Sequence, residues 1–358
     1  MTGSLDPGRP WLVLVGGFLG AGKTSLVRAA AQLLIAEGRR VAAIMNDQGA
    51  DLVDTALVRG SGVTAGQVTG GCFCCRFSDL MAAADGLAEY RPDVIFAEPV
   101  GSCTDLSATI VQVLRRDYAD RFQLAPLSVV VDPAQARAAL APDADPDIAF
   151  LFRHQVAEAD LICFSKCDRE TDFPILPSAA PVRHLSAWKT WGVGSWLHEI
   201  FSGQIAPGHV TLDVDYQRYA QAEAALGWLN YGVRLQLDVP LAPAALVGPL
   251  FDSLQAELER AGVRIVHLKA IGQAESGYVK AAVLGRGQEP VVEGPLDASP
   301  AREHEVLVNL RAAADPAQIG AIVAGVVKTL PGKRTYEHTD CFRPSPPKPE
   351  HRIAQPVL

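Results

Sequence analysis

The feature that constrains this chain most is Gly17–Thr24, whose residues are Gly-Phe-Leu-Gly-Ala-Gly-Lys-Thr. A compact apolar run, Trp11–Val15, precedes it, and Ser25–Leu34 after it is typical of a helix. A turn spaced G-x-x-x-x-G-K-T between a strand and a helix can wrap phosphate groups with inward-pointing backbone N–H groups. The sequence therefore predicts a nucleoside triphosphate site at this turn.

Within this loop, each residue type has a chemical role. The Lys23 ammonium is expected to reach the β- and γ-phosphates, and the Thr24 hydroxyl to bind Mg²⁺. The N-terminus of the following helix adds partial positive charge where the phosphates lie. The residues predicted to contact the nucleotide here are Gly17, Gly20, Ala21, Gly22, Lys23, Thr24 and Ser25.

Length and charge bound the remaining choices. The 358 residues allow two or three domains, and the formal charge of −8 argues against a nucleic-acid partner. The first ten residues lack the pattern of a signal peptide, and no apolar run reaches the length of a membrane span. We therefore expect a cytoplasmic protein.

Carboxylates follow two further apolar runs. Asp47 lies two residues after Arg40–Met45, and Glu98 ends Asp93–Glu98. Ligands bind at the carboxyl ends of strands in open α/β sheets, so Asp47 is predicted to contact metal or attacking water, and Glu98 to support Mg²⁺. Gly101 could bring a backbone N–H to the γ-phosphate. A simple turn remains the alternative for Asp47, because Asp-Gln-Gly is good turn chemistry.

Three cysteines, Cys72, Cys74 and Cys75, follow a Gly-, Ser- and Thr-rich stretch, residues 59–71, that we expect to be a loop. A helix is predicted to start at Ser78 or Asp79, and its dipole would stabilise thiolates just before it. The cluster predicts a site for Zn²⁺ or a similar soft ion, with a fourth ligand from elsewhere or from water. A redox pair and inert packing remain alternatives.

A base-recognition pattern follows the apolar run Asp160–Phe164. It is Ser165-Lys166-Cys167-Asp168, in which the Asp168 carboxylate can accept hydrogen bonds from the guanine N1–H and exocyclic amine that adenine does not offer. Further on, a backbone N–H at Ser186 or Ala187 could meet guanine O6. The pattern favours GTP.

Together these pieces resemble the CobW family of P-loop GTPases, relatives of the hydrogenase and urease maturation GTPases. The resemblance covers roughly residues 10–205 and implies slow GTP hydrolysis tied to binding and handing over a metal ion (Zn²⁺ or Co²⁺) or a metallocofactor. The recipient it implies is a client metalloprotein or a metallocofactor enzyme. Carried over by position, Lys23 and Thr24 serve phosphate and Mg²⁺, Glu98 supports Mg²⁺ or water, and Asp168 recognises the base. The matching segments are Gly17–Thr24, Gly71–Cys75, Glu98–Gly101, Ser165–Asp168 and a variant segment at Asn46–Gly49.

The chain departs from the family pattern in three places. Asp47-Gln48 replaces an acidic-aromatic pair, Ser165 stands where the guanine motif has Asn, and no histidine-rich run is present. Delivery of metal, or maintenance of a metallocofactor, is therefore favoured over metal storage. A small-molecule kinase or ATPase, and a nucleotide-dependent metal sensor, stay open as alternatives, and so does a homodimer.

The predicted fold is an α/β P-loop domain with a mostly parallel sheet, followed by a smaller α+β domain. The predicted boundaries are 10–205 for the GTPase domain, 206–227 for a linker helix and 228–330 for the second domain. The order β-α-β-β-α in the second domain fits a ferredoxin-like fold with one strand ambiguous. The Pro-rich segment 331–358 is predicted to be disordered. Whether it adds metal ligands stays open for Glu337, His338, Asp340 and Cys341.

Overall fold

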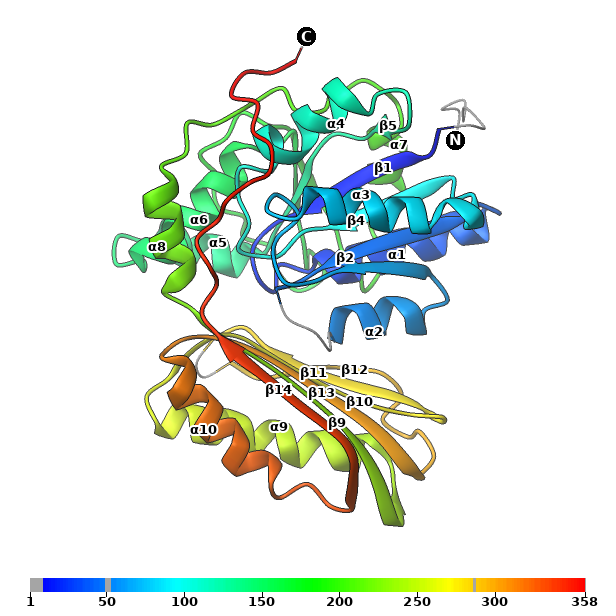
Figure 1. The fold of residues 1–358 in the computed structure, drawn as a ribbon, viewed down its shortest axis with the longest axis vertical. Helices are drawn as coiled ribbons and strands as arrows, with labels where there is room; N and C mark the ends of the chain where they lie inside the picture. Colours follow the sequence, from blue (N-terminus) through cyan, green and yellow to red (C-terminus); the bar gives the residue numbers. More distant parts are fainter. Residues whose placement is uncertain (1–8, 49–52, 286–287, 358) are drawn as a thin grey trace. The chain divides into compact units, whose positions relative to one another are not determined.

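The structure is a computed structural model that describes residues 9–48, 53–285 and 288–357. Two compact units divide the chain. The N-terminal unit comprises the described residues of 1–48, 54–222 and 346–358, and the C-terminal unit those of 49–53 and 223–345. Each unit is built around one sheet (Figure 1).

The sheet of the N-terminal unit has the strand order β3-β2-β4-β1-β6-β7-β8, with β5 pairing β1, and its pairs are parallel. Every residue of β2 and β4 is buried, because helices on both faces leave neither face of these strands to solvent (Figure 1). The strands are β1 (Trp11–Gly16), β2 (Val41–Asn46), β3 (Thr64–Val68), β4 (Val94–Glu98), β5 (Gln123–Leu124), β6 (Ser128–Val131), β7 (Leu161–Phe164) and β8 (Val182–His184).

Most helices of this unit connect one strand to the next, which is what parallel pairing requires. They are α1 (Lys23–Ala36), α2 (Val53–Gly60), α3 (Phe77–Gly86), α4 (Gln112–Asp117), α5 (Pro133–Leu140), α6 (Pro146–Ala157), α7 (Val193–Ile200) and α8 (Tyr216–Ala224), with a 3₁₀ turn η1 (Ala88–Tyr90) and a π-helix η2 (Ser107–Val111). Among the described residues, none of the helices combines the length and apolar character needed to cross a membrane.

The buried Trp196 of α7 fixes the centre of this sheet. Its ring stacks on Phe96 of β4 with centroids 6.4 Å apart, and its indole N–H donates to the Ser128 hydroxyl of β6 at 3.0 Å. Aromatic burial of this kind leaves little freedom to the strands below it. The carboxyl end of β4, which carries Glu98, is therefore held in a fixed position.

The C-terminal unit has an antiparallel sheet of order β12-β11-β10-β13-β9-β14, with α9 and α10 packed on one face (Figure 1). Taken without the β11–β12 hairpin, its elements follow the order β-α-β-β-α-β of a ferredoxin-like fold, as the sequence suggested. Its elements are β9 (Gly227–Leu241), α9 (Pro243–Arg260), β10 (Arg264–Ala274), β11 (Gly277–Val283), β12 (Val291–Glu293), β13 (Ala301–Ala313), α10 (Pro316–Val327) and β14 (Lys333–Phe342).

The prediction of a disordered end, residues 331–358, was wrong. β14 pairs with β9 from Lys333 to Phe342 and supplies the strand that the sequence left ambiguous. Residues 346–357 then lie against the N-terminal unit. Main-chain pairing accounts for β14, since it needs no apolar side chains. Both main-chain and side-chain hydrogen bonds hold residues 346–357.

The four polar residues of β14 that were considered as metal ligands do not form a cluster. The Glu337 carboxylate accepts a hydrogen bond from the Tyr231 hydroxyl at 2.9 Å, and the Cys341 thiol donates to the Pro316 carbonyl at 3.0 Å. Alternation along a strand sends His338 and Asp340 to the other face. Within the described residues, the group of side chains that could hold a metal ion is Cys72, Cys74 and Cys75.

The predicted loop 59–71 was also wrong in part, because it contains β3. This strand pairs with β2 from Thr64 to Val68. Its Thr-Ala-Gly-Gln-Val sequence lacks the continuous apolar run of the other parallel strands. β3 is a short edge strand, and four of its five residues are exposed or half-buried.

Candidate nucleotide and metal site

The glycine-rich loop between β1 and α1 depends on its glycines. Gly17, Gly20 and Gly22 have φ values of 129°, 74° and 103°, in the region that side chains disfavour. A Cβ on Gly17 would lie 2.2 Å from the Val130 carbonyl oxygen. The loop therefore curves back to place Lys23 and Thr24 at the first turn of α1.

The Lys23 ammonium lies across this loop. It donates to the carbonyl oxygens of Gly17 at 2.9 Å and Phe18 at 3.3 Å, and the side chain is buried. A phosphate group could accept the same N–H bonds in place of the carbonyls. The arrangement holds a positive charge inside the loop.

Thr24 meets Glu98 at the start of α1. The Thr24 hydroxyl donates to Glu98 Oε1 at 2.9 Å, and both side chains are buried. A hydroxyl and a carboxylate are oxygen ligands of the kind that Mg²⁺ takes. The fold thus brings together two residues 74 positions apart that the sequence assigned to one ion.

Asp47 is half-buried just after β2. Its carboxylate accepts the Gln48 N–H at 2.6 Å, and its own N–H donates to the Val68 carbonyl at 3.2 Å. This is turn chemistry within a loop at the carboxyl end of the sheet. Residue 49, which completes the predicted motif, lies outside the described residues.

The predicted base-recognition loop is attached to the glycine-rich loop. The Ser165 hydroxyl donates to the Ala21 carbonyl at 2.6 Å, and the Lys166 ammonium pairs with Asp132. Asp168 Oδ1 accepts the Ser186 hydroxyl at 2.5 Å, so the two segments predicted to contact guanine lie together. Ser165, which departs from the guanine motif, ties β7 to the phosphate loop by a side-chain hydrogen bond.

Asn46 is a positioning residue that the sequence did not single out. Its amide donates to the carbonyls of Val68 at 3.1 Å and Gly71 at 2.8 Å, while its oxygen accepts the Phe73 N–H at 2.8 Å. Since Asn46 ends β2, these bonds hold the cysteine loop against the carboxyl edge of the sheet. A buried asparagine at a strand end was the only signal for this role.

The cysteine loop turns tightly before α3. The N–H groups of Cys75 and Arg76 both donate to the Cys72 carbonyl at 3.0 Å. The turn brings the Sγ atoms of Cys72, Cys74 and Cys75 within 4.8 Å of one another. All seven cysteines of the chain are thiols rather than disulfides.

The distances between these sulfurs are near those expected for thiolate ligands around a tetrahedral metal ion. Zn–S bonds of about 2.3 Å place sulfurs roughly 3.8 Å apart. Cys74 and Cys75 are 3.8 Å apart, while Cys72 lies 2.8 Å from Cys74 and 3.3 Å from Cys75. Small side-chain rotations would open the two shorter pairs around an ion.

A fourth cysteine, Cys103, touches the cluster. Its side chain shares hydrogen bonds with the side chains of Cys72 and Cys74. The bonds from Cys103, then Cys74 and Cys75, lower the pKa of Cys72 well below its usual value, while the bond to Cys103 raises that of Cys74. A bond to Cys72 raises the pKa of Cys75 to about 11. These bonds favour ionisation of Cys72 over ionisation of Cys74 and Cys75.

The C-terminal segment 346–357, here named the strap, lies over the same loop. The Lys348 N–H donates to Cys75 Sγ at 3.1 Å, and the Glu350 N–H to the Cys74 carbonyl at 2.9 Å. The Glu350 carboxylate also accepts the Ser78 N–H at 2.9 Å and hydroxyl at 2.6 Å, and so caps α3. The cap comes from a residue 272 positions away.

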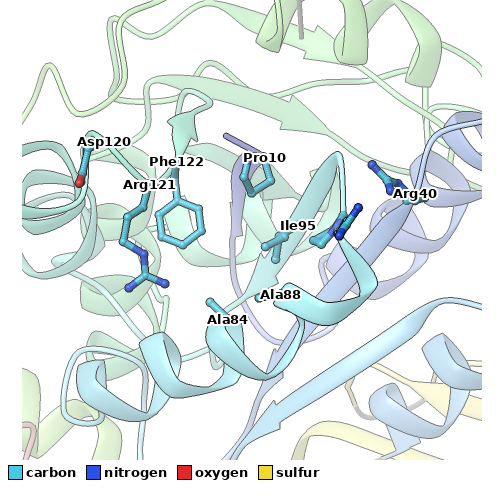
Figure 2. Close-up of a pocket in the computed structure, with 10 residues that line it drawn as sticks. Pro10, Arg40, Ala84, Ala88, Ile95, Asp120, Arg121 and Phe122 are labelled. Atoms are coloured by element: carbon cyan, nitrogen blue, oxygen red, sulfur yellow. The ribbon is translucent and has the colours of Figure 1, made fainter. Parts of the chain in front are cut away.

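A cavity of about 500 Å³ lies elsewhere in this unit (Figure 2). Its lining includes Pro10 just before β1, Ile95 near the start of β4, and Phe122 before β5. These positions are the amino ends of the strands, whereas the loops described above follow their carboxyl ends. The cavity is therefore separate from the candidate site.

Comparisons with known proteins agree with these features. Residues 11–175 match the family described as CobW/HypB/UreG, nucleotide-binding domain. The chain is similar to a zinc chaperone CobW of Sinorhizobium sp, with 30% identity over 193 residues that make up 47% of this chain and 53% of that protein. A zinc chaperone CobW of Pseudomonas aeruginosa is 26% identical over 196 residues, 44% of this chain and 49% of that protein. The chain thus spans about half the length of these curated relatives.

Two solved structures match this chain with TM-scores below 0.5. The Zn(II)-bound YjiA GTPase of E. coli has 16% identity, covers 89% of this chain and 99% of its own, and has a TM-score of 0.35. HypB of Helicobacter pylori in complex with nickel has 18% identity, covers 56% of this chain and 88% of its own, and has a TM-score of 0.41. The match to the CobW/HypB/UreG nucleotide-binding domain covers residues 11–175, less than half of the chain, and this segment carries the glycine-rich loop and the thiol cluster.

Proposed function

We propose that this chain is a cytoplasmic metal-binding GTPase that acts as a metallochaperone. It hydrolyses GTP to GDP and phosphate, and hydrolysis gates the transfer of Zn²⁺ or Co²⁺ to a client metalloprotein. The observation that carries the proposal is the thiol cluster of Cys72, Cys74 and Cys75 on the same carboxyl edge of the sheet as the phosphate loop. A nucleotide site and a soft-metal site so placed can influence each other.

At the nucleotide, the proposed roles follow the contacts that the side chains of the site make with one another and with the main chain. Gly17, Gly20, Ala21, Gly22 and Ser25 present backbone N–H groups to phosphate, with Gly101 beside them. Lys23 exchanges its carbonyl partners for phosphate oxygens, and Thr24 with Glu98 takes Mg²⁺. The Asp47 carboxylate is the candidate for orienting the attacking water.

For the base, the proposed contacts are those of Asp168 with Lys166 beside it. The Ser186 hydroxyl holds the Asp168 carboxylate, which supports a fixed acceptor for the guanine N1–H and amine. The Ser186 or Ala187 N–H would meet O6. These roles favour GTP over ATP as substrate.

The cysteine sulfurs of the cluster indicate which metal ion is the cargo. Thiolates are soft ligands that prefer Zn²⁺ over Mg²⁺ or Ca²⁺, and cobalt accepts the same tetrahedral sites. The curated relatives are named zinc chaperones, which supports zinc as the first metal to test.

The test compares the full chain with its Cys72→Ala/Cys74→Ala variant. Zinc titration against a chelator, and turnover of GTP and of ATP with Mg²⁺, are measured with and without zinc. We expect the wild type to hydrolyse GTP in preference to ATP, and the variant to lose most zinc affinity while binding GTP normally. Cys163→Ala, a buried thiol in β7 outside the cluster, is the control. Equal zinc affinities would refute the metal site, and equal turnover of ATP and GTP the GTPase.

A further inference from the structure

Cys103 lies on the loop that joins β4 to η2, away in sequence from the other cluster cysteines. Its backbone is fixed from both sides, since its N–H donates to the Val100 carbonyl at 3.0 Å and its carbonyl accepts the Gln155 amide at 2.8 Å. The residue is 1% exposed. Because its backbone is held on both sides, the buried Cys103 side chain can extend in few directions.

The Cys103 side chain contacts the thiol cluster. The side chain of Cys103 shares hydrogen bonds with both Cys72 and Cys74, the two buried members. Three cysteines on one tight turn leave a tetrahedral ion with one open position. The Cys103 sulfur comes from a different loop and is outside the group of three sulfurs that all lie within 4.8 Å of one another, so closing a four-sulfur site needs a side-chain rotation toward that group.

Building on the proposed function, we propose that Cys103 is the fourth metal ligand, so that the cargo site is a four-sulfur site of Cys72, Cys74, Cys75 and Cys103. Binding Zn²⁺ releases the thiol protons and forms four Zn–S bonds with a net charge of −2. The Lys348 N–H on Cys75 and the N-terminus of α3 lie where they offset part of this charge.

The same loop touches the nucleotide site at two points. Glu98, at its start, accepts the Thr24 hydroxyl, and Gly101 is packed so closely that an added Cβ would lie 2.9 Å from the Leu19 nitrogen of the phosphate loop. Cys103 follows two residues later. Of the four sulfurs, it is thus the one that a rearrangement around the γ-phosphate would move first. Withdrawal of Cys103 would open the site and release the ion.

The competing explanation is that Cys103 only packs as a small apolar side chain. X-ray absorption of the zinc-loaded full chain distinguishes the two. We expect four sulfurs at about 2.3 Å in the wild type, and in Cys103→Ala three sulfurs with one lighter atom at about 2.0–2.1 Å. Cys163→Ala should match the wild type. Cobalt-loaded protein should show weaker sulfur-to-cobalt charge transfer in Cys103→Ala alone.

Folding is checked separately. Thermal unfolding of the metal-free proteins and GTP binding should be alike in wild type, Cys103→Ala and Cys103→Ser, and Cys103→Ser should lose one sulfur as Cys103→Ala does. A wild type with three sulfurs, or an unchanged sulfur count in both Cys103 variants, overturns the fourth ligand and leaves the proposed function standing. A wild type that binds no zinc overturns the proposed function itself, and this inference with it.

Discussion

Glu158 is the most unusual single residue near the site. It is fully buried at the end of α6, and its carboxylate accepts the Thr104 hydroxyl at 3.1 Å and the Ser107 N–H at 2.9 Å. Burial, with the nearby charge of Asp105 acting in the same direction, raises the pKa of Glu158 to about 8. These contacts support the backbone on the C-terminal side of Cys103.

Glu158→Gln tests this arrangement through the pH dependence of stability. Since the folded pKa of about 8 exceeds the ordinary 4.5, the folded state binds the proton more tightly than the unfolded state. The free energy of unfolding of the wild type should therefore fall as pH rises from about 5 to 8, by at most a few kcal/mol. Glutamine resembles the protonated acid, so the variant should lose the part of this slope that Glu158 contributes.

Urea unfolding at intervals from pH 5 to pH 9 measures the effect, with Glu89→Gln, an exposed carboxyl in η1, as control. The pKa of buried Asp105 is also raised by burial, so part of the slope should persist in the variant. A Glu158→Gln profile parallel to that of the wild type would contradict the assignment.

At the scale of elements, the strap holds itself to the N-terminal unit through Arg352. The Arg352 guanidinium donates to Asp105 Oδ2 at 2.7 Å and to the Leu212 carbonyl at 2.7 Å. Asp105 is 1% exposed, has a φ of 64°, and also accepts the Tyr216 hydroxyl at 2.7 Å. The backbone of Asp105 is thus strained and its carboxylate is buried, and the strap supplies one of the hydrogen bonds that this carboxylate accepts.

Arg352→Ala should loosen the strap and expose Cys75. Removing one partner of a buried pair costs about 3–5 kcal/mol at most, and less where the remaining carboxyl can protonate. We expect alkylation of Cys75 in metal-free protein, mapped by mass spectrometry, to be faster by about tenfold or more. Arg343→Ala, which removes an exposed arginine of the C-terminal unit, is the control. Equal Cys75 labelling in all three proteins would show that the strap does not limit access.

Elements that bury continuous apolar runs were predictable from the sequence. β1, β2, β4 and β7 were all expected within a residue or two, because a parallel strand covered on both faces must be apolar throughout. β3 and β14 were missed because both are edge strands with polar or small residues, and main-chain pairing with one neighbour fixes them.

The same limit applies to the site. Motifs contiguous in sequence gave the phosphate loop, the cysteine turn and the base-recognition segments. Cys103 and the strap could not be found that way, because they reach Cys72–Cys75 only through the fold, from 28 and more than 270 positions beyond Cys75. The spacing of residues in a motif reveals contacts between neighbours along the chain. It does not reveal contacts between segments that are far apart in the sequence.

For the molecule as a whole, the proposed nucleotide site and the proposed metal site lie at the carboxyl edge of one sheet. α1 and β4 supply Thr24 and Glu98, β2 supplies Asn46, and the loop after β4 runs from Glu98 to the thiol cluster. Two sites joined by one short, buried loop are expected to share a coupling free energy, and such coupling is reciprocal.

Gly101→Ala tests that coupling. A Cβ at Gly101 would lie 2.8–3.0 Å from Leu19 atoms, so the loop and the phosphate loop must separate slightly. In the wild type, a non-hydrolysable GTP analogue with Mg²⁺ should change zinc affinity, and zinc should change analogue affinity, by one factor of about 5–150. In Gly101→Ala this factor should approach one, while zinc affinity without nucleotide stays near that of the wild type. Gly86→Ala in α3, where a Cβ meets open space, is the control and should keep the factor. An undiminished factor in Gly101→Ala would mean that the two sites communicate by another route, or through contacts that tolerate the added methyl group.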